Sequence, residues 1–407
     1  MRKEAFLFTR EQLEQLKTPC FVFDENELRG NFSSFTDALK DAWGDHARVS
    51  YSVKTNPFPW ILAQAHACGC MAEVVSNDEY DLALSCGFCP EDIIFNGPVK
   101  GREWFAYALR NGSAVNIDSK RELRWVRELA VGSDAPLRVG VRVNVDLERF
   151  LPGETIGGDE PGRFGFSYES GEAVRVIREL DRIEGVSVTG LHMHVTTLGR
   201  LPRAYEILAD HVCKVVKECE LADQLDYVDM GGGFYGGGLR NAGKYEEYAH
   251  SIARALKEAC DPARTALYVE PGGAVVCTPG YYVGRVVDVK DMGEKNVRFV
   301  VSELSRLNID HEMKKTAYPY VLFSRSANVM PEQHLCGFTC MESDRLCTLL
   351  DEPELAEGDM VLIKYAGAYS MSFTPGFFIE HPPAVYGFVD GTFELLRDPF
   401  SGTPATA

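Results

Sequence analysis

Several residue types that can react with or bind a cofactor stand where strand-like runs of the sequence end. Lys54 follows the alternating run ARVSYSV and precedes Thr-Asn-Pro, which cannot continue a strand. In the same way His194 lies near the end of VSVTGLHMHV, three glycines end LDYVDMGGG, and Glu270 lies at the end of ALYVEP. An amine can form an imine with an aldehyde, glycines bring backbone N–H groups close to a phosphate, and an acid can keep a ring nitrogen protonated. This combination would serve an aldehyde cofactor that carries a phosphate and a pyridine ring.

Each of these residues, taken singly, also has an ordinary structural interpretation. A lysine is usually a solvated surface charge, and a histidine at a strand end is often a satisfied core residue. The glycines could form only a tight turn, and Glu270, which precedes Pro-Gly, could be a turn acid. A cofactor site therefore requires these residues to converge with the other polar residues near strand ends, which are Glu73, Ser76, Arg142, Thr196 and Thr197.

The alternation of strand-like and helix-like segments indicates how these residues would converge. Apolar runs from ARVSYSV to ALYVEP are separated by segments with helical periodicity, such as NDEYDLALSCG and SKRELRWVRELA. About eight such strand-helix units over roughly residues 48–275 predict a (β/α)8 barrel. In that fold the residues after the strands meet at one mouth, where the chemistry is done.

The pattern changes after Gly272. The runs YYVGRVVDVK, VRFVVSEL, YPYVLF, MVLIKYAG, AVYGFV and TFELLR follow one another without long helices, which predicts an all-β domain. The run PCFVFD, which precedes the barrel, could add a strand to it. We therefore expect residues 26–275 to form the barrel domain, and residues 1–25 with 276–400 to form a β-sandwich or β-barrel domain. The tail SGTPATA is expected to be disordered.

The composition favours a protein that acts on small molecules. Of 407 residues 45% are hydrophobic, and 42 basic against 60 acidic residues give a formal charge of −18. That charge, without any dense basic run, argues against nucleic acid and membrane surfaces as partners. No segment has the apolar length of a signal peptide core or a membrane span, which favours a cytoplasmic protein. The twelve cysteines match no CxxC zinc pair, so we expect no metal site and mostly buried, reduced thiols.

An ordered series of motifs resembles one known family. YSVKTNP, AEVVSNDEYDLAL, IIFNGPVKG, GLHMHV, VDMGGGF, VEPGGAVV, CGFTCMESD and AGAYSMSF span residues 51–373. They are similar to the motifs of the fold-type III pyridoxal-phosphate decarboxylases, a group that includes ornithine, diaminopimelate and carboxynorspermidine decarboxylases. The resemblance implies a barrel domain plus a β-sandwich domain, with pyridoxal 5'-phosphate as cofactor. It also implies a head-to-tail homodimer with shared active sites at the interface.

The same resemblance implies roles for particular residues. Lys54 matches the lysine that forms a Schiff base with the cofactor, and His194 matches the imidazole stacked on its ring. Glu270 matches the acid paired with the ring nitrogen. Cys340 matches the thiol that enters from the second subunit and returns a proton after decarboxylation. The positions that match phosphate contacts are Thr197, Gly231, Gly232, Gly233 and Tyr369.

Two departures from the family pattern concern the phosphate. Gly273 stands where the family usually has an arginine that helps to hold this group. Arg200, in the loop TTLGR after the His194 strand, is a candidate for a replacement cation. The usual Gly-Ser after the histidine is Thr196 and Thr197, which keep a hydroxyl but add bulk.

A third departure concerns the substrate. Met341 directly follows Cys340, where ornithine and diaminopimelate decarboxylases carry an acid that meets the distal amino group of the substrate. Glu342 is acidic but lies one position out of register, and the segment SELSRLNIDHEM also differs from the family pattern. The predicted substrate is therefore an amino acid or conjugate without a simple basic end, such as a carrier-tethered amino acid or an intermediate of siderophore, antibiotic or polyamine-type metabolism.

Two other functions stay open on sequence alone. An amino-acid racemase or epimerase of the same fold would protonate the same carbon without releasing carbon dioxide. A catalytically silent relative could instead regulate another decarboxylase. Lys54, Cys340 and Glu270 are all intact, which counts against a silent protein, whereas Gly273 counts slightly for one.

Overall fold

The computed structural model describes residues 7–133, 135–237, 244–293, 297–310, 318–371 and 382–399. The chain divides into two compact units, one formed by Arg29–Val275 and the other by Met1–Leu28 with Val276–Ala407. We call them the barrel unit and the β unit. The first division falls inside helix α2 (Glu25–Trp43) and the second inside α10 (Gly273–Val276). The tail SGTPATA, predicted to be disordered, lies outside the described residues.

The barrel unit is built on eight parallel strands that close into a ring. Their order is β5–β4–β3–β2–β10–β9–β8–β6, and β5 pairs with β6 to complete the circle. A short strand, β7 (Phe166–Ser167), pairs with β6 outside this ring. The strands of the ring are β2 (Ala47–Ser52), β3 (Met71–Val74), β4 (Ile93–Phe95), β5 (Ala114–Ile117), β6 (Leu137–Asn144), β8 (Val186–His192), β9 (Tyr227–Asp229) and β10 (Ala266–Val269).

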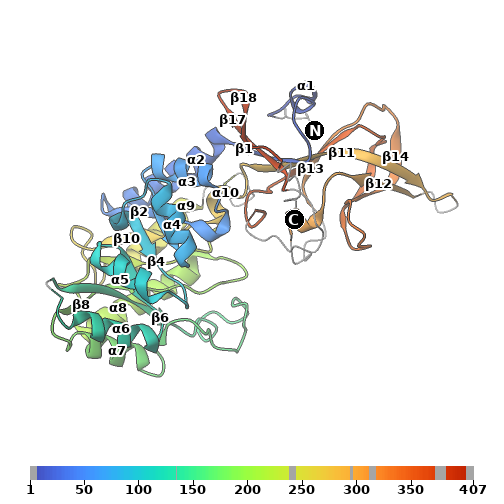
Figure 1. Ribbon diagram of the computed structural model, residues 1–407. Helices are drawn as coiled ribbons and strands as arrows, with labels where there is room; N and C mark the ends of the chain where they lie inside the picture. Colours follow the sequence, from blue (N-terminus) through green and yellow to red (C-terminus); the bar gives the residue numbers. More distant parts are fainter. Residues whose placement is uncertain are drawn as a thin grey trace. The chain divides into compact units, whose positions relative to one another are not determined.

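Burial and helix capping explain why these segments form. All residues of β3, β4 and β9 are buried, as expected for strands covered by helices outside and by other side chains inside the barrel. Ser76 and Ser119 accept backbone N–H bonds and so begin α4 (Asn77–Ser85) and α6 (Lys120–Ala130). The other helices around the strands in Figure 1 are α3 (Pro59–Ala67), α5 (Arg102–Arg110), α7 (Glu172–Leu180), α8 (Pro202–Cys219) and α9 (Tyr245–Leu256).

The parallel direction of the strands decides where a site can form. Because all eight run the same way around the ring, their carboxyl ends lie on one face of the barrel. Short turns follow several of them, including the 3-10 turn η1 (Val53–Thr55) directly after β2. The residues on these turns therefore face a common mouth.

The β unit consists of one nine-stranded sheet, ordered β15–β14–β12–β11–β1–β17–β18, with β16 paired to β11 and β13 paired to β16. Strand β1 (Cys20–Asp24) precedes the barrel in the sequence, yet it lies between β11 and β17. The long strand β11 (Gly280–Asp291) pairs with β1 and β16 along its first part and with β12 along its second. The remaining strands are β12 (Arg298–Ser302), β13 (Tyr320–Phe323), β14 (Val329–Cys336), β15 (Arg345–Pro353), β16 (Met360–Lys364), β17 (Ala384–Val389) and β18 (Thr392–Arg397).

Aromatic rings fill the core of the β unit on the side of its short helix α1 (Arg10–Leu13). Phe8 lies edge-on to Tyr281 and Phe388, with ring centres 5.3 and 4.9 Å apart. Leu13, Val22 and several strand residues complete the same buried cluster. The segment before the barrel is thus part of this core, because it supplies both β1 and Phe8.

The predicted fold class, a (β/α)8 barrel followed by a separate β domain, is confirmed. All the predicted strands form, including β1, but β7, β14 and β15 were not predicted. All twelve cysteines are free, as expected, but only five of them are buried, so the expectation of mostly buried thiols is wrong. Among the described residues no helix is long and apolar enough to cross a membrane.

Candidate active site

Lys54 is held at the barrel mouth by a buried carboxylate. It lies on η1, and its Nζ donates to Glu73 Oε2 at 2.8 Å. Ser52, the last residue of β2, donates its hydroxyl to the same oxygen at 2.7 Å. The Lys54 side chain keeps 43% of its surface exposed, whereas that of Glu73 keeps 2%. The buried carboxylate therefore orients the amine, which stays accessible from the mouth of the barrel.

Glu73 stays ionised although it is buried. Burial alone would raise its pKa, but the charge of Lys54 and the hydrogen bonds from Lys54, Ser52 and Asn96 together lower the pKa below its usual value. An anionic carboxylate at this point stabilises the ammonium form of Lys54. The pair thus explains how an amine can be kept in place beside the buried interior of the barrel.

A chain of hydrogen bonds connects this pair with other strands of the ring. The amide of Asn96 donates to Glu73 at 3.3 Å and also to Glu270. Asn116 donates its amide to Asn96 Oδ1, and the Tyr227 hydroxyl donates to Asn116 Oδ1, each at 2.9 Å. The chain therefore runs from Lys54 through residues at β3, β4 and β5 to β9, with a branch to the end of β10.

Two glycines make room for this chain. A Cβ atom at Gly140 would lie 2.0 Å from Asn116 Oδ1, and one at Gly190 would lie 2.1 Å from Tyr227 Cζ. Contacts this short cannot be relieved without moving the ring or the amide. Glycine on β6 and β8 is thus a packing requirement of the polar interior.

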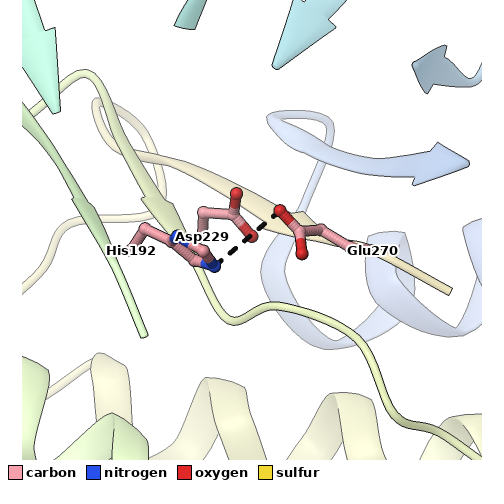
Figure 2. A group of neighbouring side chains, drawn as sticks. All are labelled: His192, Asp229 and Glu270. Atoms are coloured by element: carbon pink, nitrogen blue, oxygen red, sulfur yellow. Dashed lines mark ion pairs between the residues drawn. The ribbon is translucent and has the colours of Figure 1, made fainter. Parts of the chain in front are cut away.

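Glu270 belongs to a buried cluster with Asp229 and His192. These side chains point toward one another from the ends of β8, β9 and β10, as Figure 2 shows. One atom of each lies within 4.8 Å of the others, and His192 Nε2 is 3.8 Å from Glu270 Oε1. Neither ring nitrogen of His192 has a hydrogen-bond partner among the described residues. Such orphaned buried polar atoms indicate that the cluster is adapted to a further polar group.

The protonation state of this cluster follows from burial. Burial raises the pKa of Asp229 to about 7, and burial with the neighbouring Asp229 and Glu73 carboxylates raises the pKa of Glu270 well above its usual range. Two carboxyl groups this close cannot both ionise, so they share a proton. Burial and nearby positive charges lower the pKa of His192 well below its usual value. The 3.8 Å contact of His192 with Glu270 is therefore not an ion pair.

His194 and the glycines at 231–233 form one packed turn. The N–H of Gly232 donates to His194 Nδ1 at 3.2 Å. Burial and the charges of Arg142 and Lys54 lower the pKa of His194 to about 3, so the ring is neutral and carries its proton on Nε2. Gly231 and Gly233 have φ of +66° and +89°, which side chains rarely allow. A Cβ at Gly231 would also lie 2.5 Å from His194 Cβ.

The barrel residues fit pyridoxal 5'-phosphate, the cofactor that the resemblance implies. Lys54 offers an accessible amine, and the Asp229 and Glu270 pair offers a proton and a negative charge for a ring nitrogen. The N–H groups of Gly233 and Phe234 have no hydrogen-bond partner among the described residues, which leaves them open to a phosphate. Thr197, three residues after His194, is buried and forms an isolated antiparallel β-bridge with Thr155. Its phosphate contact remains a prediction.

The other predicted residues belong to the β unit. Cys340, Met341 and Glu342 lie on the connection between β14 and β15, where Cys340 is exposed. The Glu342 side chain is 98% exposed and pairs with Arg345 at 3.3 Å. Tyr369 follows β16 with φ of +58° and is 43% exposed. The roles of these four residues stay predictions.

Asp344 fixes the loop that carries Cys340. Its buried carboxylate accepts the Thr339 hydroxyl at 2.7 Å, the Ser305 hydroxyl at 3.1 Å and the backbone N–H of Arg306 at 2.8 Å. Arg306 also donates from Nη1 to the Ser343 carbonyl at 3.0 Å. The motif CGFTCMESD and the segment SELSRLNIDHEM therefore meet in the fold, although the last residues of that segment, 311–313, lie outside the described part.

Sequence reasoning missed several residues of these networks, including His192, Asp229, Asn96 and Asp344. Each lies inside a motif that was recognised as a whole, so the motif indicated the region but not the residue. His192 and Asp229 are the last residues of their strands, and Asn96 directly follows β4. A stricter search for polar residues at strand ends would have identified these three.

Comparison with known proteins identifies the family of the chain. The family model "Pyridoxal-dependent decarboxylase, pyridoxal binding domain" matches residues 26–277. A diaminopimelate decarboxylase of Actinosynnema pretiosum subsp. auranticum is 29% identical over 390 residues, which cover 93% of this chain and 86% of that protein. A diaminopimelate decarboxylase of Bacillus subtilis is 26% identical over 403 residues, with coverage of 94% and 89%.

Solved structures show the same fold. A diaminopimelate decarboxylase from M. jannaschii in co-complex with L-lysine has a TM-score of 0.84 at 23% identity, covering 96% of this chain and 91% of that one. A lysine/ornithine decarboxylase from Vibrio vulnificus complexed with putrescine has a TM-score of 0.74 at 20% identity, with coverage of 94% and 97%. Since the family model matches the whole barrel unit, the chain belongs to the pyridoxal-dependent decarboxylases, amino-acid decarboxylases whose cofactor is pyridoxal 5'-phosphate.

Proposed function

We propose that this enzyme decarboxylates an α-amino acid or amino-acid conjugate whose distal end carries no free ammonium group. The observation that carries the proposal is Met341, which follows Cys340 and has no charge with which to pair a cation. Glu342, the nearest acid in sequence, is exposed and already paired with Arg345. A conjugated, acylated or carrier-tethered amino acid from specialised metabolism is the substrate class that fits.

The barrel residues have defined tasks in this proposal. The bound cofactor supplies an electron-withdrawing ring that stabilises the charge left on the α-carbon when carbon dioxide departs. Lys54 must lose a proton before its amine can attack an aldehyde, and Glu73 Oε2 lies within hydrogen-bonding distance to accept it. Loss of the Lys54 charge also removes the main influence that lowers the pKa of Glu73, so the carboxylate becomes a better base at that moment.

Glu270 and Asp229 would keep the ring nitrogen of the bound cofactor protonated. Their shared proton can be donated from the Glu270 carboxyl to the nitrogen, and the carboxylate that remains stabilises the resulting positive charge. Asn96 orients Glu270 by donating to Oε1. The neutral His194 ring is held by the Gly232 N–H, which suits it to lie against an aromatic ring without adding a competing charge.

Cys340 is our candidate for the acid that protonates the α-carbon after carbon dioxide has left. It is exposed on a loop that Asp344 holds in place. In the homodimer that we propose, each site would receive Cys340 from the other chain. The match to a family of decarboxylases favours this reaction over the epimerase alternative.

Release of carbon dioxide from a panel of substrates tests the proposal. The panel contains lysine, ornithine and diaminopimelate, together with amino acids whose distal end is neutral, acidic or acylated. Burying an unpaired ammonium costs about 3–5 kcal/mol, so the diamines should be poorer by roughly two to four powers of ten in kcat/KM. A diamine used at least as efficiently as every other panel member would contradict the proposal.

Met341→Asp is the matched variant for this experiment. A carboxylate at position 341 should shift the preference toward the diamines, by less than the full amount because the surrounding loop is not preorganised for a charge. Met341→Leu keeps the apolar character and should leave the preference unchanged. An identical shift in both variants would show that the side-chain volume, and not the charge, determines the preference.

A second candidate function is decarboxylation of diaminopimelate itself. It is favoured by the names of the relatives reported above, which are diaminopimelate decarboxylases with 86% or more of their length covered. The same panel separates the two candidates, because diaminopimelate would then exceed all conjugates. In that case an acid other than residue 341 must meet the distal ammonium.

A further inference from the structure

The cofactor carries a phosphate dianion, and a positively charged side chain strengthens the binding of such a group. Three cations of the barrel unit are already paired with carboxylates. These pairs are Lys54 with Glu73, Arg142 with Asp118, and Lys100 with Glu122. Gly273, the first residue of α10, has no side chain to contribute. The phosphate therefore lacks an obvious cation in the barrel.

Arg200 lies beside the glycine turn and meets this need. It is on the connection between β8 and α8, and its Nη1 donates to the carbonyl of Phe234 at 3.4 Å. Its guanidinium lies over the ring of Tyr235, 4.6 Å from the ring centre. Phe234 directly follows the glycines at 231–233, whose turn leaves the N–H groups of Gly233 and Phe234 open among the described residues. No described carboxylate forms an ion pair with Arg200.

The backbone of Arg200 is fixed in an uncommon conformation. Its φ is +48°, in the left-handed region that arginine rarely adopts. The Tyr248 hydroxyl donates to the Arg200 carbonyl at 2.6 Å and accepts the Tyr235 N–H at 3.4 Å. One hydroxyl therefore ties the arginine backbone to the glycine turn. A side chain kept at such a position against its backbone preference indicates a function for that side chain.

We infer that Arg200 binds the phosphate of pyridoxal 5'-phosphate and supplies the charge that Gly273 cannot. A guanidinium has five N–H donors, and the long contact with the Phe234 carbonyl uses only one of them. The other donors can reach phosphate oxygens together with the backbone N–H groups of the turn. This inference rests on the cofactor of the family and not on the identity of the substrate.

Binding of two aldehydes to the apoprotein tests the inference. Pyridoxal 5'-phosphate and pyridoxal share the ring and the aldehyde, and only the first has the phosphate. The test variant is Arg200→Asn, because asparagine tolerates a left-handed backbone and carries no charge. Its Kd for pyridoxal 5'-phosphate, from fluorescence titration, should rise roughly 10- to 100-fold, as expected for loss of charge-assisted hydrogen bonds. Its Kd for pyridoxal should stay within about twofold of the wild-type value.

Three further variants make the result decisive. Arg200→Lys keeps a charge and should recover part of the phosphate preference. Arg203 is an exposed arginine on the first turn of α8 and is paired with Glu206, so Arg203→Asn should change neither Kd. Arg200→Gly relaxes the backbone and repeats the comparison if Arg200→Asn does not fold. Equal weakening of both aldehydes, or an unchanged Kd for pyridoxal 5'-phosphate, would overturn the inference. Neither readout depends on catalysis, so failure here leaves the proposed substrate class untouched.

Discussion

Lys54 and Glu73 show how one buried acid can prepare a reactive amine. The carboxylate is almost completely covered and receives three side-chain donors, so its position is determined by the barrel and not by the lysine. Lys54, in contrast, is nearly half exposed at the mouth. A partner that is fixed while the amine remains accessible is the arrangement that a covalent cofactor bond requires.

The first prediction concerns Lys54. The purified wild-type protein should be yellow, and borohydride should fix the cofactor to a peptide that contains Lys54, because reduction makes the bond permanent. Lys54→Ala should lose both the colour and the fixation. Mass spectrometry of the reduced digest checks this. Lys217→Ala, which changes an exposed lysine on α8, is the control and should behave as wild type.

A wild-type protein that stays colourless after incubation with pyridoxal 5'-phosphate would refute this assignment. Fixation at a lysine other than residue 54 would also refute it.

The second prediction concerns the pH dependence of stability in the apoprotein. Burial raises the pKa of Asp229 from 3.8 to about 7, so the folded protein holds a proton that the unfolded chain releases above about pH 4. The wild-type free energy of unfolding should therefore fall, through this group, as the pH rises from about 4 to 7. Asp229→Asn removes the titration, so its stability relative to wild type should increase over that window and level off above it.

Urea unfolding of the two apoproteins at several pH values between 4.5 and 8 measures this difference. Asp223→Asn, at a position that is 93% exposed, is the control and should give a constant difference from wild type. Parallel curves for Asp229→Asn and wild type would show that Asp229 does not hold the proton.

At the scale of elements, the barrel could be predicted and part of the β unit could not. The eight barrel strands are apolar runs, most of them followed by Pro, Gly or Ser and separated by segments with helical periodicity, so the local sequence locates them. Strand β14 reads VMPEQHLC and lacks such a signal, because Pro331 and Glu332 interrupt its apolar residues and Val329 is 62% exposed. It forms because β12 and β15 pair with it on both sides. That stabilisation is tertiary and leaves little trace in the local sequence.

The site itself was only partly predictable for a similar reason. Lys54, His194, Glu270 and the glycines stand at strand ends, where the fold alone suggests a mouth. Asn116 and Tyr227 lie within strands that read as ordinary buried β-structure, so their polar chain appears only once the strands are placed side by side. The substrate contacts of the β unit have no comparable geometric rule, and only the resemblance indicates them.

The third prediction belongs to the connection between β14 and β15. Asp344 accepts two hydroxyls and a backbone N–H in a buried position, so Asp344→Asn replaces an acceptor with a donor that faces other donors. We expect a loss of about 1–3 kcal/mol in the free energy of unfolding, with a larger effect on activity because the Cys340 loop loosens. Circular dichroism during urea unfolding measures the first quantity.

Asp351→Asn is the matched control. Asp351 is exposed and has φ of +52°, which asparagine tolerates, so stability should change little. Equal stability of Asp344→Asn and wild type would mean that the loop is held by other contacts.

At the scale of the whole molecule, the fourth prediction tests the proposed homodimer. If Lys54 of one chain acts with Cys340 of the other, then Lys54→Ala and Cys340→Ala should each be inactive alone. Refolding the two together should restore about a quarter of the wild-type activity per chain, since half of the randomly formed dimers are mixed and each mixed dimer has one intact site. Carbon dioxide release measures the recovery.

The control for this mixing experiment is co-refolding of Lys54→Ala with His194→Ala, two changes within the barrel unit, which should restore nothing. If heterodimers form but activity does not recover in the first mixture, then Lys54 and Cys340 act within one chain, or Cys340 takes no part in the reaction.

The polar chain across the barrel also has an evolutionary consequence. Asn116 and Tyr227 occupy space that Gly140 and Gly190 leave free, since any Cβ there would overlap them. A lineage cannot acquire a side chain at either glycine while keeping both partners, and it cannot lose the tyrosine without opening a hole beside Gly190. Variants with only one of these changes would be destabilised and would be removed by selection. These four positions should therefore covary among relatives, switching together between a polar and an apolar interior, even though none of them reaches the mouth where selection on substrate acts.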